Sequence, residues 1–383
     1  MFLALRDLRF ATGRFALMGS VVALISLLLV MLSGLTAGLG GQNTAAIDRL
    51  GEQGVQRLVF GGAAGQEPSA SFTQSEFTVA QRDAWAATDG VASVEPLGVS
   101  QGRAIGLEHP VDTDPQGRAD VSGEPTTGVA TTAFIGLTPG GSDAPAGVEP
   151  GQIVLSQDVA DSLHAQAGDA VAVSGFVYTV ADVVPTEYYS HSPVTWLALE
   201  DWNAISHTAD DAVLGTAGLV RFDAGADVDA VAAAGDDAAG TVAETVKGSY
   251  AALPSYRSEN GSLMTMQGFL YGISALVVIA FLSIWTVQRT RDIAVLKALG
   301  GSNGWVLKDS LAQAAFVLVG GVAVGTGLAA VVGAFAGRAV PFELSWATTA
   351  VPAAGVLVLG MLAAVVAVYR VTRIDPLVAL GGN

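Results

Sequence analysis

The sequence has no cysteine and few charged residues, which make up 14% of its 383 positions. Without cysteine, disulfide scaffolds and thiolate catalytic or metal sites are excluded. Basic residues are also scarce: 18 Lys and Arg against 35 Asp and Glu give a net charge of −17. That balance argues against a nucleic-acid binder. A mean hydropathy of +0.50 excludes a wholly disordered chain. The composition therefore predicts a membrane protein with a sizeable water-exposed part.

Four apolar runs reach the length of about 20 residues that an α-helix needs to cross hydrocarbon. They cover approximately residues 15–39, 263–287, 311–337 and 346–369. We therefore predict a first transmembrane helix at residues 15–40, a second at 263–288, and a third and fourth within 311–370. A cleaved signal peptide is the alternative for the first run. Its apolar stretch exceeds the h-region of about 7–15 residues, so we interpret it as a retained anchor.

Lysine and arginine placement predicts the orientation of these helices, because cytoplasmic loops carry an excess of both. Residues 1–14 contain three arginines and residues 289–310 contain two arginines and two lysines, and Arg370 and Arg373 lie at the C-terminal tail, predicted at residues 371–383. Both termini and the middle loop are therefore expected in the cytoplasm, and residues 41–262 outside. That outer stretch carries 30 of the 35 acidic and 8 of the 18 basic residues. An acidic surface keeps an exported domain soluble but identifies no ligand.

The outer stretch has a mixed α and β pattern. Strands are predicted at 55–60 and 194–199, and a hairpin at 170–184 around Gly175, and residues 153–155 form a short apolar run. Helices are predicted after a capping box at Thr78 and Gln81, and at 158–166 between a Ser156 cap and Gly168. Residues 108–127 are expected as a loop and 224–246 as a helix with loops. The predicted fold class is a membrane α-helical protein of four transmembrane helices. A mixed α/β extracytoplasmic domain is inserted between the first and second.

Signs of an enzyme are missing from the sequence. The four histidines are scattered without the spacing H-E-x-x-H, and no G-x-x-x-x-G-K-[ST] loop is present. The chain is therefore not expected to hydrolyse ATP itself. His191 follows Tyr188, Tyr189 and Ser190 in an aromatic segment before Pro193, and it is the histidine to examine for ligand contact.

The predicted middle loop contains a short amphipathic helix. Ile293, Leu296 and Leu299 recur at helical spacing, and Gly300 and Gly301 end the pattern. Such a helix can be an interfacial anchor on the membrane. It can equally be a plug that docks in a groove of a cytoplasmic partner.

Two cytoplasmic motifs resemble those of FtsX/MacB-type ABC transporter permeases. They are V-L-K-A-L-G-G-S at residues 295–302 and R-I-D-P-L-V-A-L at 373–380, and the order of spans and outer domain also resembles this family. The resemblance implies a bacterial cytoplasmic membrane protein that works as a homodimer with two copies of a separate P-loop ATPase. It also implies mechanotransmission, in which ATP-driven closure of the ATPases moves the spans and outer domains without a continuous channel.

The resemblance also assigns roles to cytoplasmic residues. The coupling helix would contact the ATPase through Leu296, Lys297, Leu299 and Gly300, and Arg6 and Arg9 would lie on an amphipathic helix along the inner leaflet.

Gly34 and Gly38 place small residues on one face of the first span, where two helices of a dimer could approach closely. The simpler alternative is that glycine is common in transmembrane helices.

The segment that begins the second span is most like the haem-exporting branch of this family. That likeness implies haem as the transported substrate, with no catalytic cofactor. Glu259 would ligate the iron as a hard oxygen donor, Arg257 or Tyr256 would hold the propionates, and Met264 and Met266 would pack on the porphyrin. The alternative for Glu259 is that it caps the second span, since a carboxylate is favourable at a helix N-terminus.

Competing functions share parts of this pattern. An ABC permease of the same fold could move another amphiphile, such as a lipid, a lipoprotein or an antimicrobial peptide. An FtsX-like mechanical transducer would instead regulate a cell-wall hydrolase and move no solute. A free-standing membrane-anchored sensor would leave both cytoplasmic motifs unexplained. Membrane lipids are expected partners in every case.

Overall fold

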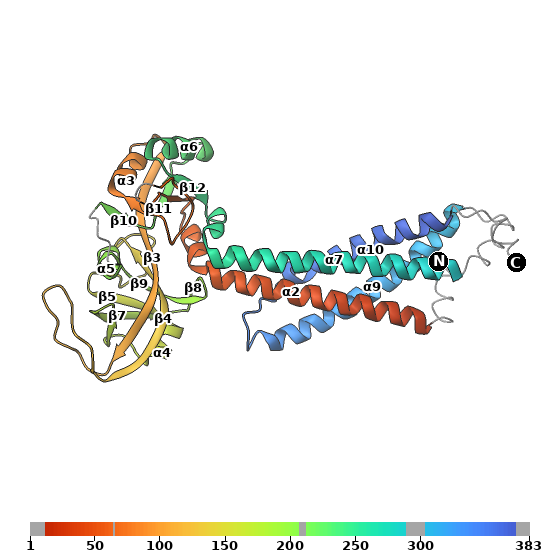
Figure 1. Ribbon diagram of the computed structural model, residues 1–383, viewed down its shortest axis with the longest axis horizontal. Helices are drawn as coiled ribbons and strands as arrows, with labels where there is room; N and C mark the ends of the chain where they lie inside the picture. Colours follow the sequence, from red (N-terminus) through yellow and green to blue (C-terminus); the bar gives the residue numbers. More distant parts are fainter. Residues whose placement is uncertain (1–11, 64–65, 207–211, 289–302, 373–383) are drawn as a thin grey trace, which may run out of the picture. The chain divides into compact units, whose positions relative to one another are not determined.

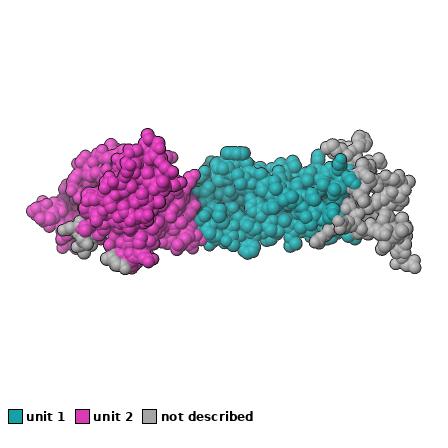
Figure 2. All heavy atoms as spheres, turned by 90° about the horizontal axis from the view of Figure 1, so that it is seen from above, with its two compact units in different colours: residues 1–39, 260–383 teal, residues 40–259 magenta. Residues whose placement is uncertain are grey.

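A computed structural model describes residues 12–63, 66–206, 212–288 and 303–372. Its contacts divide the chain into two compact units, coloured separately in Figure 2. We call residues 1–39 and 260–383 the helical unit, and residues 40–259 the sheet unit. The sheet unit lies in sequence between the first and second apolar helices.

Four long helices build the helical unit and lie side by side in Figure 1. They are α2 (Thr12–Glu52), α7 (Pro254–Gln288), α9 (Asn303–Ala336) and α10 (Trp346–Thr372). All four are long and apolar enough to cross a membrane. Helix α7 begins before the predicted residue 263 and α9 before the predicted residue 311, because polar turns extend each helix beyond its apolar run. Ser345 and Thr348 exchange side-chain to backbone hydrogen bonds at the start of α10, in the manner of a capping box.

Small residues allow α2 and α9 to approach closely. A Cβ added to Gly325 would lie 2.1 Å from the carbonyl oxygen of Ala23, and one added to Gly321 would lie 2.9 Å from that of Gly19. Backbone therefore packs against backbone at this crossing, which is typical of helices in lipid.

The face of α2 that carries Gly34 and Gly38 is filled by the same chain. A Cβ on Gly34 would meet the ring of Phe342, and one on Gly38 would lie 2.2 Å from the carbonyl oxygen of Pro341. The amide of Glu343 donates to the oxygen of Gly34 at 3.0 Å. Packing within one chain thus accounts for both glycines, and their predicted contact between two copies stays a prediction.

A ten-stranded sheet dominates the sheet unit, in the order β12-β1-β11-β3-β4-β9-β5-β7-β6, with β8 paired to β9. Strand β6 pairs with β3 as well as with β7. The six strands β3, β4, β9, β5, β7 and β6 therefore form a closed ring, in which each strand pairs with the next. The strands of this sheet are β1 (Arg57–Phe60), β3 (Val91–Leu107), β4 (Thr126–Leu137), β5 (Gln152–Ser156), β6 (Ala170–Val173), β7 (Phe176–Val184), β8 (Tyr188–Tyr189), β9 (Ser192–Ala198), β11 (Ala217–Phe222) and β12 (Val242–Thr245).

Shorter elements complete the sheet unit. Strands β2 (Phe77–Thr78) and β10 (Val213–Gly215) form a second small sheet. The helices are α3 (Val79–Ala86), α4 (Gln157–Leu163), α5 (Leu199–Ile205), α6 (Val228–Ala239) and the 3₁₀ turn η1 (Gly248–Ala252).

Local patterns predicted several of these elements correctly. The capping box of Thr78 and Gln81 opens α3, and β6 and β7 form the predicted hairpin. Helix α4 was predicted too long, because His164 adopts a left-handed conformation and ends it after Leu163. Ser156 occupies the predicted N-cap position of α4, but its hydroxyl makes no capping bond, because it donates to the backbone oxygen of Val194 at 2.5 Å.

The first hydrophobic core of the sheet unit holds the candidate site in place. It gathers Ile47 and Leu50 from α2, Tyr189 and Trp196 from β8 and β9, and Leu253 just before α7. The outer turns of α2, the β8–β9 hairpin and the first turn of α7 are therefore fixed against one sheet.

Candidate functional site

The β8–β9 hairpin turns through two residues with left-handed backbone. Tyr189 pairs with Ser192 across the turn, and Ser190 and His191 have φ values of 47° and 63°. This is the pattern of a type I′ turn, where Asn-Gly is usual because both positions need positive φ. An L-residue in this conformation costs roughly 1–2 kcal/mol. The sheet unit thus presents two polar side chains on an unfavourable backbone.

Backbone hydrogen bonds attach this turn to α2. The amide of Ser190 donates to the oxygen of Asn43 at 3.1 Å, and the amide of His191 donates to that of Gln42 at 2.9 Å. Below the turn, the Tyr188 hydroxyl donates to Asp158, and this bond raises the pKa of Tyr188 to about 12. The hairpin is therefore bonded to α2 through its turn and to α4 through Tyr188.

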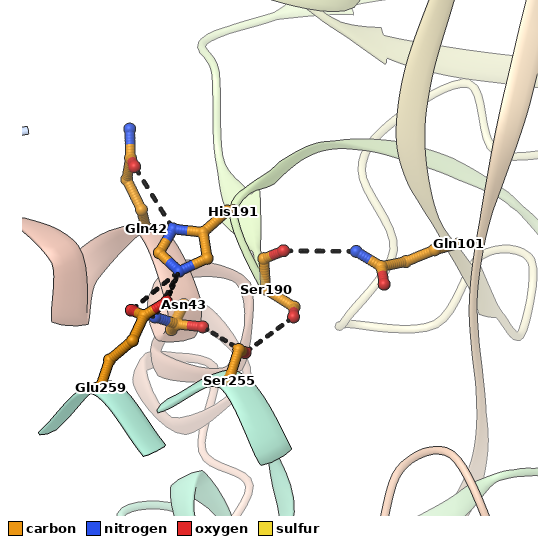
Figure 3. A network of polar contacts seen from close by, with 7 residues as sticks. All are labelled: Gln42, Asn43, Gln101, Ser190, His191, Ser255 and Glu259. Atoms are coloured by element: carbon orange, nitrogen blue, oxygen red, sulfur yellow. Dashed lines mark hydrogen bonds and ion pairs between the residues drawn. The ribbon is translucent and has the colours of Figure 1, made fainter. Parts of the chain in front are cut away.

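The imidazole of His191 meets the carboxylate of Glu259, as Figure 3 shows. Its Nε2 lies 2.9 Å from each carboxylate oxygen, and the Asn43 amide nitrogen donates to Oε2 at 3.2 Å. Because an unprotonated Nε2 and an ionised carboxylate would repel each other, a proton lies between them. The Glu259 side chain remains 38% exposed, so it is accessible to a ligand.

Asn43 is oriented by further bonds. It is buried, and its Oδ1 accepts from the Ser255 hydroxyl at 2.6 Å. The hydroxyl oxygens of Ser255 and Ser190 lie 2.9 Å apart. The Gln101 side-chain amide donates to the backbone oxygen of Ser190 at 3.3 Å. We call the residues of Figure 3 the polar cluster: Gln42, Asn43, Gln101, Ser190, His191, Ser255 and Glu259.

Of the predicted haem residues, the polar cluster contains only Glu259. The ring of Tyr256 packs edge-on against Tyr250, with centroids 5.5 Å apart, next to the first core. Arg257 is exposed and forms no ion pair within the described residues. The capping alternative for Glu259 is wrong, because α7 already begins at Pro254 and the carboxylate accepts from His191 and Asn43.

The helical unit has an apolar cavity of about 570 Å³, to which Met266 contributes and Met264 does not. Met264 is exposed elsewhere on α7. The lining side chains are all apolar: Leu28, Met31, Leu32, Leu35, Met266, Phe269, Leu270, Ala336, Val340 and Phe342.

Several predicted residues lie outside the described part of the chain. They include the coupling residues Leu296, Lys297, Leu299 and Gly300, the arginines Arg6 and Arg9, and residues 373–380.

The sequence analysis missed Gln42, Asn43 and Ser255. The only local signal was that Gln42 and Asn43 are the first polar residues after the first apolar run.

Residues 264–376 match the family described as FtsX-like permease C-terminal. This part of the chain is an FtsX-like permease domain. Two Staphylococcus epidermidis proteins with the provisional name hemin transport system permease protein HrtB are 21% identical over 387 residues, covering both chains fully. A Staphylococcus haemolyticus protein of that name is 29% identical over 130 residues, which span 34% of this chain and 37% of the relative.

Two solved structures are similar to parts of this chain. The extracellular domain of YknZ, a noncanonic ABC-type transporter from Gram-positive bacteria, has 14% identity and a TM-score of 0.31, covering 48% of this chain and 95% of that one. The periplasmic region of MacB from Actinobacillus actinomycetemcomitans has 10% identity and a TM-score of 0.33, covering 50% and 89%. Both scores are too low to establish a shared fold.

The sequence comparisons confirm the class of protein expected from the motifs. The family of this domain is that of ABC transporter permeases, which are non-enzymatic membrane subunits with the ATPase in a separate subunit.

Proposed function

We propose that this permease belongs to an ATP-driven exporter that extracts haem from the membrane and expels it by mechanotransmission, which confers resistance to haem toxicity. The observation that carries the proposal is the Glu259 carboxylate, which is oriented by His191 and Asn43 and still partly exposed. The full-length similarity to proteins provisionally named for hemin transport supports the same substrate.

A lone carboxylate suits haem better than a free metal ion. Within the described residues, no group of three or more His, Asp and Glu side chains could hold a metal ion. Haem needs fewer protein ligands, because the porphyrin nitrogens already surround the iron. A carboxylate oxygen is a hard donor, suited to ferric iron and weak enough for release.

Other parts of haem also have candidate partners in the chain. The exposed guanidinium of Arg257 is available for a propionate, and the hydroxyl of the partly buried Tyr256 is a second candidate donor. The cavity at Met266 has a volume in the range of about 300–1,000 Å³ that small-molecule sites occupy. Thioethers adapt to flat apolar ligands, which favours porphyrin contacts for Met264 and Met266.

The proposed transport cycle also needs a defined assembly. Two permease copies would join two ATPase subunits, with both termini and residues 289–310 in the cytoplasm and the sheet unit outside. Leu296, Lys297, Leu299 and Gly300 would dock on the ATPase. Gly34 and Gly38 would contribute to the contact with the second copy, beside the Phe342 and Pro341 of the same chain that pack against them.

Hemin titration tests this function. The permease and its ATPase in nanodiscs should show a saturable Soret change that empty nanodiscs lack. Glu259→Gln should weaken hemin affinity at least about tenfold because it removes a ligand charge, whereas Glu149→Gln, at an exposed position outside the polar cluster, should not. A native protein without saturable binding would exclude haem as the substrate.

Export of another amphiphile is the second candidate. The all-apolar lining of the cavity favours it, since an acyl chain needs no polar partner. Stimulation of ATPase activity by a lipid or lipopeptide, with none by hemin, would support this alternative.

A further inference from the structure

We propose that the β8–β9 turn sets the conformation of the Glu259 carboxylate, with His191 as a positioning residue for the substrate. The inference rests on the proposed function, because it takes Glu259 as the iron ligand. It gives the sheet unit a role in substrate binding, which is to hold the Glu259 carboxylate in one orientation.

Direct hydrogen bonds carry the first step. The His191 Nε2 lies 2.9 Å from both oxygens of Glu259, and the Asn43 amide reaches one of them at 3.2 Å. A glutamate side chain that is 38% exposed would otherwise sample several rotamers. Because the two donors do not use all the lone pairs of a carboxylate, one remains for a ligand.

Attachment of the turn carries the second step. Ser190 and His191 are bonded through their amides to α2, and Tyr189 is buried in the first core. The position of the imidazole is therefore set by the sheet and by α2 rather than by α7, on which Glu259 lies. Any displacement of the turn from α7 would break the bonds to Glu259.

Backbone conformation carries the third step. Ser190 and His191 occupy a turn type that asparagine and glycine fill at lower cost. A residue kept on such a backbone needs compensating contacts, and here the side chains of both residues supply them through Ser255 and Glu259. The side-chain contacts of the turn with Ser255 and Glu259 therefore explain why Ser190 and His191 occupy this backbone.

The test compares His191→Ala with His191→Gln in the full permease with its ATPase in nanodiscs. The glutamine amide nitrogen can replace the Nε2 donor, whereas alanine cannot. Loss of an outer-shell partner typically costs 10–100-fold in metal affinity, so we expect about that loss of hemin affinity for His191→Ala and recovery to within about threefold of native for His191→Gln. His109→Ala, on an exposed loop, is the matched control and should bind hemin as the native protein does.

Spectra separate positioning from direct ligation. If His191 only positions Glu259, the Soret band and the electron paramagnetic resonance signal of bound ferric haem should keep their form in all three variants. Native affinity in His191→Ala would overturn the proposal. So would a nitrogen-ligated signal that His191→Ala abolishes and Glu259→Gln retains. Absence of hemin binding by the native protein would instead overturn the proposed function. Should His191→Ala not fold, His191→Leu, which also lacks a hydrogen-bond donor, takes its place: weakened affinity with native spectra supports positioning, and native affinity overturns it.

Discussion

The two units differ in where their largest apolar side chains lie: they are buried in the sheet unit and exposed in the helical unit. In the sheet unit Trp85, Trp196 and Phe60 are fully buried, as the hydrophobic effect requires of a domain in water. In the helical unit Phe269 is 69% exposed and Leu276 is 65% exposed. Lipid tails are as apolar as these side chains, so covering them brings little gain in a membrane.

Packing inside the two units differs for the same reason. Alanine and glycine contribute many of the helix contacts in the helical unit, where Gly325 meets Ala23 and Ala364 is completely buried. The first core of the sheet unit includes large rings, such as those of Phe60, Phe72 and Trp196. Added volume should therefore damage the helical unit most, and removed volume should damage the sheet unit most.

The largest expected effect is that of Gly325→Leu. A Cβ at this position would lie 2.1 Å from the backbone oxygen of Ala23, so α2 and α9 would have to separate. Gly320→Leu is the matched control, because nothing lies within 4 Å of a Cβ there. We expect loss of folded protein in detergent for Gly325→Leu alone, measured by size-exclusion chromatography. Equal yields of the two variants would contradict the close packing of these helices.

Removal of a large ring is the reciprocal test. Trp196→Ala should destabilise the sheet unit by about 3–5 kcal/mol, because a cavity would replace a side chain that is 2% exposed. The midpoint of thermal unfolding should fall by about 6–20 °C. Trp346→Ala, at an 81% exposed position in the helical unit, should change the midpoint very little. Similar shifts for both would break the comparison between the units.

A covalent bond can fix the hairpin to α7 within the sheet unit. The hydroxyl oxygens of Ser190 and Ser255 are 2.9 Å apart, and the chain has no cysteine of its own. We expect Ser190→Cys with Ser255→Cys to form a disulfide on oxidation and to stabilise the sheet unit by about 2–4 kcal/mol. Thiol alkylation before and after oxidation measures the bond. The two single variants are controls, and thiols that stay reactive after oxidation would disprove the geometry of the polar cluster.

Sequence patterns predicted features that depend on neighbouring residues. Apolar length located the four long helices, and the capping box located α3. Strands β3 and β4 were missed, although they are the longest strands described. Both contain glycines that weaken a strand pattern. The structure explains Gly98 and Gly136, because the Trp202 side chain lies where a Cβ on either would be.

The polar cluster illustrates why sites are harder to predict than helices. Glu259 could be selected from its place at the start of an apolar run. Its partners could not, because Asn43 lies 216 residues and His191 68 residues away in the sequence. The turn that presents His191 also lacks the asparagine and glycine typical of its conformation.

The smallest expected effect concerns a half-buried carboxylate in the sheet unit, that of Glu187. Burial raises the pKa of Glu187 more than the nearby Arg49 lowers it, and Oε2 is buried without a hydrogen-bond partner. A carboxyl whose pKa is raised on folding is stabilising below its unfolded pKa, and this advantage is lost as the pH rises through the folded value. Glu187→Gln should therefore stabilise the protein by about 1 kcal/mol at pH 7 and by less near pH 4. Thermal unfolding at both values, with the exposed Glu149→Gln as control, measures the difference. An equal gain at both pH values would show that the charge of Glu187 is not the cause.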